Sequence, residues 1–225
     1  MPAPVHRLRK REIIELSKGH CKHGHSYLDH YECWLKEQPD KQERVGFIDI
    51  ETTNLDANFG MMLSYCIKEQ GKKKIHEALI TRADMDDAPA GKEDRRIVES
   101  CIRDLAKFDR IVTYYGRRFD VPFIRTRALS CGVGFPHYST LVHDDLYFVV
   151  RNRFKLSSNR LEMACRVLLG DTNKTRLEPS LWRAAGRGDK KSLAYIIDHN
   201  RKDVIDLERL YDKIMDFAAK RDTSI

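Results

Sequence analysis

The sequence predicts an α/β fold with a mixed sheet, and three observations support this prediction. Short apolar stretches at residues 45–51, 61–67 and 74–80 follow one another with turn residues between them, as in a three-strand antiparallel meander. From residue 93 onward, helical and strand patterns alternate. With 225 residues, 41% of them hydrophobic, the chain can bury one substantial core. A meander followed by this alternation is typical of layered α/β proteins.

The later elements follow from local patterns. Residues 93–108 carry apolar side chains at helical spacing, and residues 110–115 form a short apolar run expected of a buried strand. Residues 119–130 predict a helix with Pro122 in its first turn, where a missing N–H costs little. We expect a loop at 84–91, a strand at 140–143, and helices at 146–153, 159–169, 179–185 and 190–220.

Composition narrows the class of protein. No run of eighteen apolar residues is present, and the basic residues 1–11 are followed by no apolar stretch. We therefore expect no membrane span, no secretory signal and a cytoplasmic location. The six cysteines are scattered, which favours reduced thiols over a disulfide framework. A net charge of +7 modestly favours a polyanionic partner such as nucleic acid.

The N-terminal part differs from the rest in composition. Five of the nine histidines lie within the first thirty residues, and this enrichment does not recur later. From residue 44 the strand pattern begins. We therefore predict an N-terminal Cys/His-rich extension over residues 1–42 and a domain over residues 43–225, with the boundary near residues 38–42.

The extension contains residues that are typical zinc ligands. They are Cys21, either His23 or His25, His30 and Cys33. We take His25 as the histidine of the first pair, although the spacing does not match a standard zinc finger. One tetrahedral Zn²⁺ would supply folding energy that so short a segment cannot obtain from an apolar core. The alternative is a partly ordered polar arm without metal.

Two acidic residues lie on the first predicted strand. Asp49 and Glu51 are two residues apart, so the strand pleat points both carboxylates to one face, while Ile48 and Ile50 fill the other. Burying an acidic pair in an apolar strand is costly unless a cation binds it. The pattern indicates a metal site, and its alternative is a pair that faces solvent.

Two further motifs place chemically active residues in the second half of the chain. Asp120 follows the predicted strand 110–115 and begins the next helix, where the simplest role of an aspartate is an N-cap. On the last predicted helix, His199 and Asp203 are four residues apart and therefore share a face. Taken alone, this last pair could simply be solvated.

Together the motifs resemble those of the DEDD superfamily of 3′–5′ exonucleases, and within it the predicted YprB-like exonucleases. The resemblance covers roughly residues 45–212. It rests on Asp49-Ile50-Glu51-Thr52, Tyr115-Gly116-x-x-Phe119-Asp120-x-Pro122-Phe123, Asp145-Leu146-Tyr147, the helix 161–170 and His199-Asn200-x-x-Asp203-Val204.

This resemblance implies a ribonuclease H-like fold and a two-metal hydrolysis of phosphodiester bonds at the end of a nucleic acid strand. It implies that Asp49, Glu51, Asp120 and Asp203 hold two ions, Mg²⁺ or Mn²⁺, with Asp49 bridging both. We expect Thr52, Arg117, Arg118 and Phe119 to contact the substrate, a single strand or a 3′ end.

The candidate residue for activating water departs from the family pattern in its spacing from the last aspartate. Tyrosine-type members carry their tyrosine four residues before the last aspartate, and histidine-type members carry their histidine five residues before it. Here His199 stands four residues before Asp203. We expect His199 to be the general base, because the unperturbed pKa of histidine suits that role near neutrality, with Tyr195 as the alternative. Two other functions stay open, namely a ribonuclease H-like endonuclease or resolvase and a non-cleaving nucleic-acid-binding module.

Overall fold

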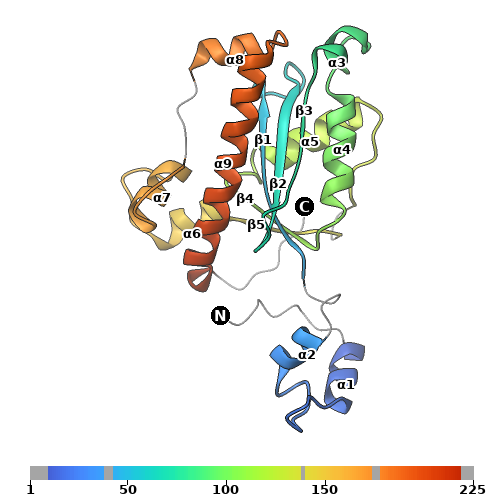
Figure 1. Cartoon of the computed structure of the whole chain (residues 1–225), viewed down its shortest axis with the longest axis vertical. Helices are drawn as coiled ribbons and strands as arrows, with labels where there is room; N and C mark the ends of the chain where they lie inside the picture. The colour runs from blue at the N-terminus through green and yellow to red at the C-terminus, as the bar shows by residue number, and fades with distance from the viewer. Residues whose placement is uncertain (1–9, 38–42, 138–139, 174–177, 219–225) are drawn as a thin grey trace. The chain divides into compact units, whose positions relative to one another are not determined.

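The computed structural model describes residues 10–37, 43–137, 140–173 and 178–218 (Figure 1). The chain separates into two compact units, Met1–Glu43 and Arg44–Ile225. The boundary predicted at residues 38–42 lies outside the described residues. Within the described ranges, every helix is too short or too polar to cross a membrane.

The larger unit is organised by a five-stranded sheet in the order β3-β2-β1-β4-β5 (Figure 1). Strands β1 (Val45–Thr52), β2 (Met62–Glu69) and β3 (Ile75–Leu79) pair antiparallel, as the meander prediction required. Strands β4 (Arg110–Thr113) and β5 (Val142–Asp145) continue the sheet in parallel beside β1. The predicted α/β class with a mixed sheet is confirmed.

Two apolar clusters fill the two faces of the sheet. Ile48 and Ile50 belong to the cluster that includes buried residues of α4 (Arg95–Leu105) and α5 (Asp120–Ser130). Phe47 belongs to the other, with buried residues of α9 (Lys190–Ile214). Since side chains alternate along a strand, Asp49 and Glu51 share the face of Phe47, on which α9 lies.

Helices α6 (Leu146–Arg153), α7 (Leu161–Leu168) and α8 (Pro179–Ala185) lie where helices were predicted. A short 3₁₀ turn, η2 (Met215–Phe217), follows α9. The end of the helix predicted at 190–220 falls partly outside the described residues.

Two local predictions need correction. The stretch predicted as a loop begins within α3 (Arg82–Asp87), which is capped by a reciprocal pair of hydrogen bonds between Thr81 and Asp84. This helix buries none of its residues, so the sequence has no apolar periodicity there that would predict it. The last strand lies two residues later than predicted, because its pairing with β4 matches Val142 with Arg110 and Asp145 with Thr113.

The smaller unit contains α1 (Lys10–Lys18), a tight turn and α2 (Tyr31–Glu37). An isolated bridge between His20 and Ser26 closes the turn. Among its described residues, the buried apolar side chains are Leu16, Cys21 and Trp34, and the Trp34 ring stacks on Tyr31 at a centroid distance of 5.3 Å. This is a very small apolar core.

Candidate active site

Helix α9 presents a histidine and two polar residues to β1. Asp203 lies four residues after His199 and three after Asn200, so all three residues occupy one side of the helix, and all three are buried. Asp189 accepts a hydrogen bond from the backbone N–H of Ser192 at 2.9 Å and caps the start of this helix. The packing of α9 against β1 and β2 fixes which side of the helix faces the strands (Figure 1).

Glu51, His199 and Asp203 form a compact group. The Nε2 atom of His199 lies 3.7 Å from Glu51 Oε1 and 3.6 Å from Asp203 Oδ2. One ligand atom from each residue lies within 4.8 Å of the others, so a single metal ion could contact all three. The contacts of the imidazole are longer than direct hydrogen bonds. The sequence-predicted partners from β1 and α9 are therefore brought together.

Asp49 is held by a residue whose role the sequence analysis missed. The side-chain amide of Asn200 donates to Asp49 Oδ2 at 2.6 Å. Asn200 is fully buried, and its Oδ1 has no hydrogen-bond partner among the described residues. The amide therefore fixes one oxygen of the half-buried Asp49 carboxylate.

Asp120 is joined to the same segment of β1. It is the first residue of α5 rather than its N-cap, and its Oδ1 accepts a hydrogen bond from the backbone N–H of Ile50 at 3.2 Å. The parallel pairing of β1 with β4 ends at Phe47, so the N–H of Ile50 lies beyond the ladder. The Asp120 carboxylate thus reaches the backbone between Asp49 and Glu51.

Burial is the main cause of the shifted pKa of Asp120. It raises the pKa of this carboxyl to about 7, although hydrogen bonds from two backbone amides favour the charged form. The nearby negative charge of Asp145 raises the pKa further. A cation beside this carboxylate would reverse the effect, because it favours the ionised form.

A family model described as the RNase H superfamily matches residues 46–215. The chain belongs to the RNase H superfamily. The family B DNA polymerase from the hyperthermophilic archaeon Pyrobaculum calidifontis has a similar structure, with a TM-score of 0.60 and 19% sequence identity. The match covers 77% of this chain and 24% of the polymerase chain, and at this identity it shows the fold alone. No curated protein matches the chain.

The loop that leads to Asp120 in this RNase H domain is held by Asp145, which the sequence analysis named in a motif without giving it a role. Asp145 accepts hydrogen bonds from the backbone N–H groups of Tyr115 at 2.7 Å and Arg117 at 3.0 Å. Tyr115 has a φ of 70°, which is uncommon for a residue with a side chain. A Cβ at Gly116 would lie 2.5 Å from the Thr113 side chain, so this position requires glycine.

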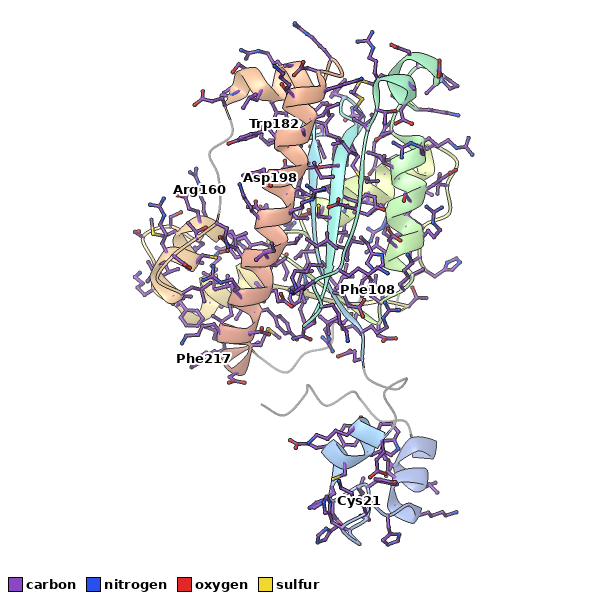
Figure 2. The ribbon with its side chains drawn as sticks, in the orientation of Figure 1. Cys21, Phe108, Arg160, Trp182, Asp198 and Phe217 are labelled. Carbon is purple, nitrogen blue, oxygen red and sulfur yellow. The ribbon has the colours of Figure 1, made fainter. Side chains whose placement is uncertain are left out.

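Four residues were predicted to bind substrate, and their surroundings differ. Thr52 is buried, and its carbonyl accepts a hydrogen bond from the indole of Trp182 on α8 at 2.5 Å (Figure 2). The Arg117 guanidinium donates to the carbonyl of His143 at 3.1 Å. Phe119 packs against the core. Arg117 and Arg118 are both exposed. Because the Arg117 guanidinium already binds the His143 carbonyl, Arg118 is the member of this set best placed to meet a polyanion from solution.

The Cys/His group of the smaller unit is formed by Cys21, His23, His30 and Cys33. The choice of His25 is therefore corrected to His23. The backbone carbonyl of His25 accepts from Cys21 N at 2.9 Å and closes the turn, and the His25 ring packs beside that of His30, with centroids 4.1 Å apart.

Proposed function

We propose that the RNase H domain is a metal-dependent 3′–5′ exonuclease that hydrolyses phosphodiester bonds at nucleic acid ends by a two-metal mechanism. The observation that carries this proposal is that acidic residues from three separate segments converge on one stretch of β1. Asp203 lies in a group with Glu51, and Asp120 accepts a hydrogen bond from the Ile50 N–H. Asp49 and Glu51 come from β1, Asp120 from the start of α5 and Asp203 from α9. The chain order of these acids is that of the DEDD exonucleases it resembles.

The donor set fits hard divalent cations. Carboxylate oxygens are the ligands that Mg²⁺ and Mn²⁺ prefer, and Asp49, Glu51, Asp120 and Asp203 would hold them. A buried carboxylate is costly without a cation, and the raised pKa of Asp120, caused mainly by its burial, expresses this cost. When bound, the two cations would stabilise charge on the phosphate and lower the pKa of the attacking water.

His199 is proposed as the general base. Its Nε2 faces Glu51 and Asp203 within 3.7 Å of each carboxylate, so a water held there lies within reach of a neutral imidazole. The imidazole would take a proton from the water as the water oxygen bonds to phosphorus. The bond between phosphorus and the 3′ oxygen would break, and the leaving 3′ oxygen would take a proton from solvent water. The products are a nucleoside 5′-monophosphate and a strand shortened by one nucleotide with a free 3′ hydroxyl.

Other residues take supporting roles in this proposal. Asn200 and Asp145 are positioning residues, because the first fixes an oxygen of Asp49 and the second fixes the loop before Asp120. Arg118 would contact the phosphates of the incoming strand. Tyr195, the alternative to His199, is half-buried one helical turn before it.

Digestion of 5′-end-labelled and circular substrates tests the proposal. The linear substrates, single- and double-stranded DNA and RNA, should yield a ladder that shortens one nucleotide at a time with Mg²⁺ or Mn²⁺, and circular substrates should resist. Asp203→Asn should abolish the ladder. Asp198→Asn is the matched control, since Asp198 lies on the same helix and pairs with Lys202 (Figure 2).

Other outcomes would identify the competing functions. Cleavage of circular substrates or internal cuts would identify an endonuclease or resolvase. Binding without any hydrolysis in either metal would identify a non-cleaving module.

A further inference from the structure

The smaller unit presents two pairs of metal-type ligands on two short local structures. Cys21 and His23 lie in the turn between α1 and α2, where Gly24 N donates to Cys21 O at 2.8 Å and Gly24 has a φ of 82° (Figure 2). His30 immediately precedes α2, and Cys33 lies three residues later in its first turn. Each pair is therefore held by local backbone geometry.

The four side chains converge in an arrangement that hydrogen bonds do not explain. Cys21 Sγ lies 3.7 Å from His23 Nδ1 and 3.6 Å from His30 Nδ1. Cys33 Sγ lies 3.5 Å from His23 Nδ1 and 3.9 Å from His30 Nδ1. Each Nδ1 offers a single in-plane position, either one lone pair or one N–H. Two sulfurs that approach the same Nδ1 cannot both form good hydrogen bonds with it, so at most two of the four contacts are satisfied in this way.

A tetrahedral metal ion accounts for all four distances at once. Zinc binds cysteine sulfur at about 2.3 Å and histidine nitrogen at about 2.0–2.1 Å, which in a tetrahedron separates sulfur from nitrogen by about 3.5–3.6 Å. The four observed separations run from 3.5 to 3.9 Å. The site therefore has the dimensions that a zinc ion would require.

The small core of this unit supplies an independent argument. Its described residues bury few apolar side chains, while Ile13, Ile14 and Leu28 are each more than 40% exposed. Segments below about 40 residues usually need a metal, disulfides or association to fold. Cys21 and Cys33 are free thiols, so no disulfide fills this role.

We propose that Cys21, His23, His30 and Cys33 bind one structural Zn²⁺, a site beyond the nuclease function proposed above. Both thiols would lose their protons on binding, and two thiolates with two neutral imidazoles balance the charge of the ion. All four positions are taken by protein atoms, which is typical of structural rather than catalytic zinc. The ion would join the turn to α2 and stabilise the unit.

Metal analysis of the full chain, purified without chelator or metal-affinity resin, tests the site. The wild type should carry one zinc per chain, and Cys33→Ser or His23→Ala should lose it. His25→Ala is the matched control, because His25 lies two residues from His23 but outside the group. Chelation should make residues 10–37 sensitive to protease.

Replacement of zinc by Co²⁺ gives a second readout that does not depend on variants that fold poorly. The wild-type chain should show the intense visible bands of tetrahedral, thiolate-bound Co²⁺. A wild type with neither zinc nor these bands would overturn the proposal. So would loss of metal from His25→Ala with retention by His23→Ala, or a Cys21–Cys33 disulfide in the purified, metal-free chain.

A separate observation concerns the loop before Asp120. Tyr115 is 44% exposed and has a left-handed backbone conformation. The buried Asp145 carboxylate accepts a hydrogen bond from the backbone N–H of Tyr115. Its ring lies 4.7 Å from that of Tyr147 and 6.5 Å from that of Phe148. Unfavourable backbone conformations persist where the surroundings enforce them, and they concentrate at binding and active sites.

We infer that Tyr115 stacks on a base of the substrate strand, an inference that rests on the proposed function. An exposed ring five residues before Asp120, with exposed Arg118 in the same loop, combines the two features by which proteins hold single strands, base stacking and phosphate contact. The neighbouring rings would keep Tyr115 in place before a strand arrives.

Binding of a short single-stranded oligonucleotide without divalent metal, when no hydrolysis occurs, tests this inference. Tyr115→Ala should weaken binding roughly 5- to 150-fold, the range of one stacked base, whereas Tyr115→Phe should bind like wild type. Phe217→Ala, which removes an exposed ring on η2, is the control. Equal binding by wild type and Tyr115→Ala would overturn the stacking role. No binding by the wild type would instead contradict the proposed function as well.

Discussion

The two metal sites proposed for this chain are built in opposite ways. In the smaller unit, the ligands lie between Cys21 and Cys33, on one turn and the start of one helix. In the RNase H domain, the acids come from β1, α5 and α9, and Asn200 reaches Asp49 across 151 positions of the chain. The first group is assembled by local backbone geometry, and the second by the whole fold.

This difference predicts opposite responses to metal. The smaller unit has little apolar core, so the metal would contribute directly to its folding. The RNase H domain has two buried clusters that pack both faces of its sheet, so it can hold its acids in place without any ion. Metal should therefore decide the structure of the first unit and the activity of the second.

The largest expected effect is loss of hydrolysis when one acid of the domain is neutralised. Asp49→Asn, Glu51→Gln, Asp120→Asn and Asp203→Asn should each abolish nuclease activity, because each removes a proposed ligand. Without metal, the melting temperature should stay level or rise, since one source of repulsion is gone. Full activity in any two of these variants would contradict the two-metal assignment.

Removal of the proposed base should have the next largest effect. His199→Ala should lower turnover roughly 10²- to 10⁴-fold and flatten the acid side of the pH–rate profile, whereas Tyr195→Phe should change little. Profiles at several Mg²⁺ concentrations provide a control, because an acid limb caused by metal loss moves with Mg²⁺ and one caused by His199 does not. If Tyr195→Phe loses most of its turnover while His199→Ala keeps nearly normal turnover, Tyr195 rather than His199 serves the attacking water.

Replacement of Asn200 measures how far the acidic site depends on residues that position its proposed metal ligands. Asn200→Ala should reduce Mg²⁺ affinity or activity by roughly 10- to 100-fold, the usual effect of losing a group that orients a metal ligand. Unchanged Mg²⁺ dependence of the rate in Asn200→Ala would show that Asp49 needs no such support.

The last expected effect is on stability rather than on activity, and it depends on pH. The folded pKa of Asp120, about 7, lies above its unfolded value near 3.9, so the fold favours the protonated form. Without added Mg²⁺ or Mn²⁺, the stability of the domain should therefore fall as pH rises from about 4 to about 7. Thermal melts across this range should show a shallower decline for Asp120→Asn. Identical slopes in both proteins would argue against a raised pKa.

The sequence predicted those parts of the site that depend on local periodicity. The two-residue period of a strand places Asp49 and Glu51 on one face, and the helical offset brings His199 and Asp203 together. Asn200 was named in a motif but given no role, because no local pattern reveals a partner 151 positions away. The role of Asp145 likewise depends on a loop 30 positions earlier in the chain.

The other differences between the predictions from the sequence and the structure arise from local backbone geometry. The choice between His23 and His25 depends on a turn whose course is set by the left-handed Gly24, which spacing alone does not encode. Helix α3 lacked an apolar stripe, although the Thr81 and Asp84 pair that caps it was a readable signal. The register of β5 was set by its neighbour β4.

The hydrogen bond from Ile50 N–H to Asp120 makes one backbone amide a natural reporter of the site. This amide lies beyond the end of the β1–β4 ladder and donates to a side chain that is expected to change its charge when metal binds. The ¹⁵N–¹H resonance of Ile50 should shift as Asp120 titrates and again as Mg²⁺ is added. A single backbone signal would then follow the electrostatic state of the site in solution, without any substrate.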